Sequence, residues 1–97
     1  MHIGVCTLQL RMPENGSLKD KRQVVRSVAD RVRRRFNVSI AEVADNDVWG
    51  LATLGFACVS NDARHADETL SNVVRFIQAL RLDAEVVDVQ TEVISGV

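Results

Sequence analysis

Residues 48–80 read VWGLATLGFACVSNDARHADETLSNVVRFIQAL, and the spacing of their apolar side chains changes near Asn61 and Asp62. Before that point the segment is rich in β-branched and aromatic residues, which favour a strand. After it, apolar residues recur every three or four positions, as on one face of a helix: Ala66, Leu70, Val73, Ile77 and Leu80. We therefore predict a strand over 48–60 and a helix whose N-cap is Asn61 or Asp62.

The segments on either side of this strand and helix are also predicted to be strands. VSIAEV (38–43) is a short strand, and ADND (44–47) is a turn whose Asx side chains can bond their own backbone. AEVVDVQTEVI (84–94) forms the last strand. Gly50 and Gly55 interrupt the long strand. Interior glycines mark a bulge or a close backbone approach, so we expect this strand to bend.

The first part of the chain predicts a strand followed by a long helix. HIGVCTLQLRM (2–12) alternates between two faces, and PENG (13–16) has the composition of a turn. Ser17 opens a helix that extends to about Phe36, and Asn37 is expected to close it in the left-handed conformation. The apolar stripe of this helix contains Leu18, Val25, Val28, Ala29, Val32 and Phe36.

Together these elements give the order βαββαβ in a single domain over residues 1–97. This order predicts a ferredoxin-like α+β sandwich, in which a four-stranded antiparallel sheet carries two helices on one face. The 97 residues are 46% hydrophobic and 26% charged, as in ordinary soluble domains. The first ten residues resemble no signal peptide, no apolar run is long enough for a membrane span, and we expect a cytoplasmic protein.

Charge is distributed unevenly along the chain. Residues 1–36 contain nine Lys or Arg and three acids, whereas residues 37–97 contain three Arg and ten acids, so the two parts carry +6 and −7. Most of the positive charge falls on the first helix, including its first turns, where the helix macrodipole disfavours cations. We interpret this pattern as an anion- or RNA-binding surface, whose candidate residues are Lys19, Lys21, Arg22, Arg26, Arg33 and Arg34. The alternative is that these cations are solvated or pair with acids of neighbouring strands or of a second subunit.

Other functional classes find less support in the sequence. His2, His65, Cys6 and Cys58 lack the spacing of a zinc site, and no flanking pattern activates a nucleophile, so we predict no metal, no cofactor and no catalytic residue. With no Tyr, one Trp and three Phe, the chain is poorly equipped to stack bases on its sheet. Trp49 is interpreted as a packing anchor at a sheet or subunit edge.

The chain resembles the YlxP-like family of small bacterial domains of unknown function. The resemblance rests on the order and spacing of SLKDKR (17–22), RFNVSIAEV (35–43), DVW (47–49), Gly55 and VSND (59–62). It implies a ferredoxin-like fold and a bacterial gene often located near translation-initiation and ribosome-maturation genes. It implies no activity and assigns no catalytic residue.

Three functions are therefore compatible with the sequence. We expect a non-enzymatic accessory factor that binds ribosomal RNA or ribosomal particles through its first helix. The first alternative is a dimeric module that docks an acidic protein on the same helix, and the second is a small enzyme or ligand sensor. The apolar residues on both faces of the strands also predict self-association through the second sheet face. We expect no membrane partner.

Overall fold

The computed structural model describes residues 1–13 and 16–97, and it confirms the predicted order of elements. Glu14 and Asn15, in the predicted PENG turn, lie outside the described residues. The elements follow one another in this order: β1 (His2–Arg11), α1 (Leu18–Arg35), β2 (Ser39–Ala44), β3 (Leu51–Ser60), α2 (Ala63–Ala79) and β4 (Glu85–Ser95).

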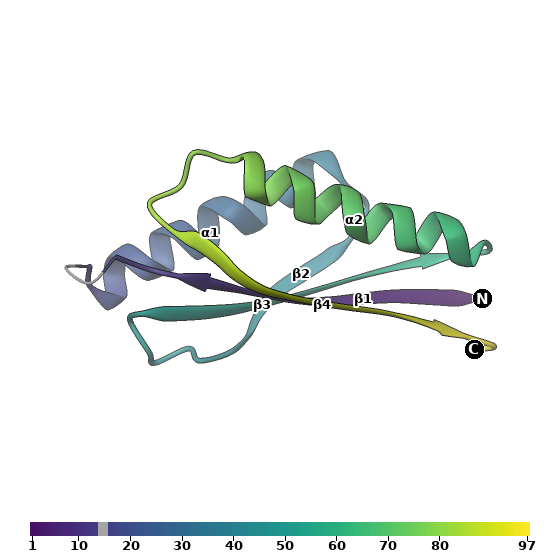
Figure 1. Cartoon of the computed structure of the whole chain (residues 1–97), viewed down its shortest axis with the longest axis horizontal. Coiled ribbons are helices and arrows are strands. Elements are labelled where there is room, and N and C mark those ends of the chain that lie inside the picture. The colour runs from purple at the N-terminus through teal and green to yellow at the C-terminus, as the bar shows by residue number, and fades with distance from the viewer. Residues whose placement is uncertain (14–15) are drawn as a thin grey trace.

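The four strands form one antiparallel sheet with the order β2-β3-β1-β4. Both helices lie on the same face of this sheet, and the other face carries no described helix (Figure 1). Because β3 lies between β1 and β2, the first βαβ unit is split, which is the topology of the ferredoxin-like sandwich. The predicted fold class is confirmed.

The core lies between the helices and the inner sheet face. Alternate residues of β1 and β3 point into it, which follows from the two-residue period of a strand. Val25 and Phe36, which we expected in the core, are only partly buried at its margin. The side chains that are almost fully buried include Leu8, Leu10, Val28, Val32, Leu54, Leu70, Val73 and Ile77.

The helix starts follow the sequence prediction, whereas one helix end does not. Ser17 caps α1 in a capping box with Asp20, and Asp62 caps α2 by accepting a hydrogen bond from the Arg64 N–H. Phe36, and not Asn37, is the C-cap of α1, and its φ of −128° is extended. The chain thus passes directly from α1 towards β2, and the expected left-handed residue is not used.

The loop between β2 and β3 is longer than predicted, because β3 begins at Leu51 and not at Val48. Asp45 has a φ of 63°, and its backbone oxygen accepts a hydrogen bond from Val48 N at 3.0 Å, so a turn is present at the predicted position. The Asp45 carboxylate bonds the Thr53 hydroxyl and not the local backbone, so it does not form the predicted Asx bond. Gly55 marks a close approach: a Cβ at this position would lie 2.8 Å from Cγ1 of Val43 on the neighbouring strand. The register of β3 against β1 is continuous, and the register shift lies in the β2 pairing.

Candidate functional site

The outer surface of α1 carries most of the predicted site residues. Val28, Ala29 and Val32 turn the helix towards the core, so the residues on its other sides face solvent. Five of the six candidate side chains are exposed there: Lys19, Arg22, Arg26, Arg33 and Arg34. We refer to these five residues as the α1 basic surface.

Arg33 is the member of the α1 basic surface that is held most firmly. Its guanidinium donates to the backbone oxygen of Ile40 at 2.8 Å and lies 3.3 Å from the Asp30 carboxylate. Half of the side chain remains exposed, so these contacts orient the guanidinium without removing it from solvent. An oriented guanidinium loses less conformational entropy when it binds a phosphate.

Lys21, the sixth candidate, does not lie on the surface. Its side chain is fully buried, and its ammonium lies 2.9 Å from Glu42 Oε2. It also donates to two backbone oxygens of the loop between β2 and β3, that of Asp45 and, at 2.7 Å, that of Val48. The prediction that Lys21 contributes to a surface anion site is therefore wrong, and for this residue the alternative of pairing with an acid of a neighbouring strand is correct.

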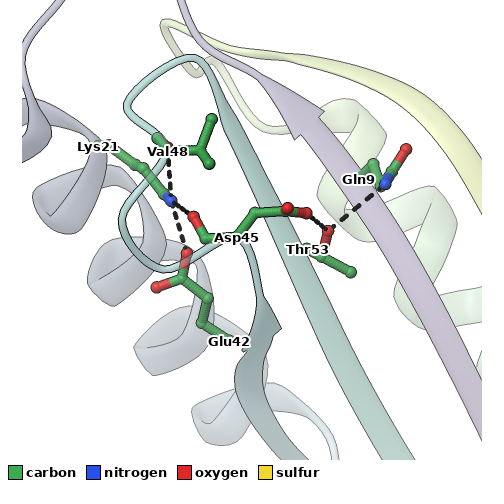
Figure 2. A network of polar contacts seen from close by, with 6 residues as sticks. All are labelled: Gln9, Lys21, Glu42, Asp45, Val48 and Thr53. Atoms are coloured by element: carbon green, nitrogen blue, oxygen red, sulfur yellow. Dashed lines mark hydrogen bonds and ion pairs between the residues drawn. The ribbon is translucent and has the colours of Figure 1, made fainter.

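The Lys21 contacts join α1 to the β2–β3 hairpin (Figure 2). An ion pair with Glu42 Oε2 and hydrogen bonds to the backbone oxygens of Asp45 and Val48 replace the hydration of the buried ammonium. Glu42 Oε2 is itself buried and accepts no hydrogen bond from a described residue. Asp45 extends the network into the sheet, because its Oδ2 accepts a 2.6 Å hydrogen bond from the Thr53 hydroxyl. We call Lys21, Glu42, Asp45, Val48 and Thr53 the Lys21 network.

The spacing of the sequence contained a signal for this burial. Lys21 precedes Val25 by four residues and Val28 by seven, which places it on the apolar stripe of α1. Charge dominated the prediction, although position on the helix was the better guide to exposure. The acidic partner was not identifiable from sequence, since Glu42 is 21 positions away and one of several acids after residue 37.

The N-terminus of α1 is less suited to an anion than the sequence suggested. The Asp20 N–H donates to the Ser17 hydroxyl at 3.2 Å, and the Ser17 N–H donates to the Asp20 carboxylate at 3.1 Å. The capping box therefore occupies backbone donors of the first turn and places a carboxylate beside them. These contacts leave fewer free backbone donors for an anion at the helix end.

The cysteines have the features of core residues. Cys6 and Cys58 are both buried and free. Burial raises the pKa of the Cys6 thiol to about 11, so that it stays protonated and a poor nucleophile near neutral pH. Both thiols therefore pack as small apolar side chains.

Neither a membrane-crossing helix nor a metal-binding cluster occurs in residues 1–13 and 16–97. Within these ranges, no helix has the length and apolar character needed to cross a membrane. In the same part of the chain, no three His, Cys, Asp or Glu side chains are grouped so that they could hold a metal ion. The exposed cations of α1 remain the most distinctive chemical feature of the described surface.

Comparison with known proteins identifies the family. Residues 3–91 match the model of a family described as "Protein of unknown function (DUF503)". The chain belongs to this family. It is also 35% identical over 77 residues to "Uncharacterized protein YlxP" of Bacillus subtilis (strain 168), a match that covers 79% of this chain and 84% of the Bacillus protein. The resemblance to the YlxP-like family is thus confirmed, and neither description names an activity.

Proposed function

We propose that this protein is a cytoplasmic, non-enzymatic accessory factor that binds RNA or a ribosomal particle through the α1 basic surface. The observation that carries the proposal is the exposure of five Lys and Arg side chains on one helix of a chain whose net charge is −1. Residues 37–97 carry a net −7, so a polyanion would be repelled by most of the molecule and attracted to this helix.

The dimensions of α1 suit a nucleic-acid backbone. Lys19 and Arg34 are 15 residues apart, which corresponds to about 22 Å along the helix axis. This length allows contact with several phosphates of one strand. Because the contacts would be made to phosphates, we expect binding with strong salt dependence and little sequence preference.

The proposal is tested by reversing two charges of the α1 basic surface. The Arg22→Glu, Arg26→Glu variant should bind ribosomal particles at least about tenfold more weakly in low-salt co-sedimentation, and the slope of log affinity against log salt should fall by roughly 2. The matched control is Arg64→Glu, Arg75→Glu, which makes the same charge change at exposed positions of α2. The control variant should retain most of the binding.

Two results would reject the proposal. Equal losses in both variants would show that net charge, and not the α1 surface, controls the interaction. Binding that survives nuclease treatment of the particles and depends on Arg22 and Arg26 would indicate an acidic protein partner instead of RNA.

A further inference from the structure

The sheet face opposite the helices exposes an apolar surface that the fold leaves uncovered (Figure 1). Ile3 pairs with Val59 on β3 and with Ile94 on β4, so these three side chains form a row across three strands. Val59 is 67% exposed and Ile94 38% exposed, although side chains of this kind are normally buried. We call this the Ile3 row.

Next to the Ile3 row the same face is hollow. Thr7, Ser39, Ala41, Gly55 and Ala57 are small residues, and together with Val5, Val43, Gln90 and Glu92 they line a depression of about 660 Å³. Gly55 allows the Val43 side chain to pack directly over the backbone of β3, where a larger residue at position 55 would clash with it. One sheet face thus has large apolar side chains at one end and a depression near its middle.

We propose that this face binds a second copy of the chain, with the Ile3 row of each protomer seated in the depression of the other. In a two-fold dimer the same patch lies on both sides of the contact, so the patch must be complementary to itself. A row of large side chains beside a row of small ones meets this requirement. A two-fold axis that passes between the two rows places the large row of each protomer against the small row of the other. Sheets packed face to face also bury alternate residues of each strand in this way.

The available area is consistent with a dimer. The strands contain 10, 6, 10 and 11 residues. With strands about 4.8 Å apart and about 3.3 Å per residue, the sheet face presents roughly 600 Å². Two such faces would bury roughly 1,200 Å², which is the lower end of the range for specific interfaces. Asp88 lies on this face in the edge strand β4, where a polar rim is expected, and Glu92 of the same strand borders the depression.

The charges of the face argue against other occupants. Asp88 and Glu92 would repel a nucleic acid or an anionic lipid surface. The proposed contact leaves the α1 basic surface on the outer side of the dimer. The dimer proposal therefore stands independently of the proposed RNA binding.

Sedimentation velocity at micromolar concentration tests the dimer. The wild-type chain should sediment as a dimer, and Val59→Asp should weaken dimerisation at least about tenfold. Ala57→Leu should also weaken it, because the added methyl groups fill the depression without adding charge. The matched control is Ala79→Asp, which places one carboxylate at an exposed apolar position on the helix side of the molecule.

The outcomes separate the dimer from its alternatives. A monomeric wild type, including one that binds some other molecule on this face, would overturn the proposal. A dimer that survives both Val59→Asp and Ala57→Leu, or that is lost in Ala79→Asp, would place the interface elsewhere. Circular dichroism melting of each variant ensures that loss of the dimer is not loss of the fold.

Discussion

The second helix and the first two turns of α1 pack on the same sheet face but bury different chemistry. In α2, the four buried residues Ala66, Leu70, Val73 and Ile77 are all apolar. In α1, the stripe that contains Val28 and Val32 also contains Lys21, which is 1% exposed. Both stripes follow helical spacing, so position on the helix indicates burial in both, whereas residue type fails at one buried position of α1, Lys21.

The two regions also differ in what their burial depends on. An apolar side chain gains free energy when it leaves water, whatever apolar atoms surround it. A buried ammonium is tolerated only when specific oxygens replace its hydration. For Lys21 these oxygens come from residues 42, 45 and 48, so the start of α1 is stable only when the β2–β3 hairpin is in place.

Replacing Lys21 with Met should have the largest effect on stability. The substitution keeps most of the side-chain volume but leaves the Glu42 carboxylate and two backbone oxygens without their donor. We expect the free energy of unfolding to fall by about 3 to 5 kcal/mol, as when one partner of a buried ion pair is removed. Urea denaturation measures the loss, and hydrogen exchange of the Val48 amide should show that the hairpin opens first.

A double-mutant cycle with Glu42→Leu separates charge from packing. The Lys21→Met, Glu42→Leu variant should recover part of the lost stability, because no buried charge remains. It should stay below wild type, since the Asp45 and Val48 oxygens still lack the ammonium. Strict additivity of the two single losses would show that Lys21 acts through its methylene groups and not through its charge.

Replacing Leu70 with Ala tests the apolar side of the comparison. Leu70 is fully buried in α2, and its side chain lies close to Gly4 of β1. We expect a loss of about 2 to 5 kcal/mol in the free energy of unfolding, with a cavity and no local opening of the hairpin. Thermal and urea denaturation measure this loss. A loss well below this range would contradict the packing of α2 described here.

Periodicity made most of the fold predictable from sequence. The element order and the stripes of both helices followed from apolar spacing, and Ser17 was identified as an N-cap from its side chain. The failures involve contacts between distant segments, which spacing along the chain does not encode. Lys21 needed Glu42 as a partner, and the start of β3 moved from Val48 to Leu51 because residues 45–50 form the loop that Lys21 binds.

The same distinction applies to the candidate site. Sequence predicted the exposed cations of α1 correctly where they lie off the apolar stripe, as Arg22 and Arg26 do, because exposure depends on helix geometry. It did not predict the contact of Arg33 with the Ile40 backbone oxygen, which exists only because β2 packs beside α1. Residue type and position on the helix must therefore be combined to predict which charged side chains are exposed to a ligand.

The smallest expected effect concerns the two ends of the α1 basic surface. Lys19 lies in the first turn of α1 and Arg34 in the last. Lys19→Glu should stabilise the chain by about 0.3 to 1 kcal/mol, because a carboxylate suits the positive end of the helix macrodipole, and Arg34→Glu should destabilise it by a similar amount. Both variants change the net charge equally and both should weaken RNA binding, so affinity should fall in each while stability moves in opposite directions.

Urea denaturation at low salt, paired with ribosome co-sedimentation, makes both measurements on the same samples. If stability changed in the same direction in both variants, net charge and not the macrodipole would control it. If affinity followed stability, the loss of binding would reflect a change in the fold and not the removal of phosphate contacts.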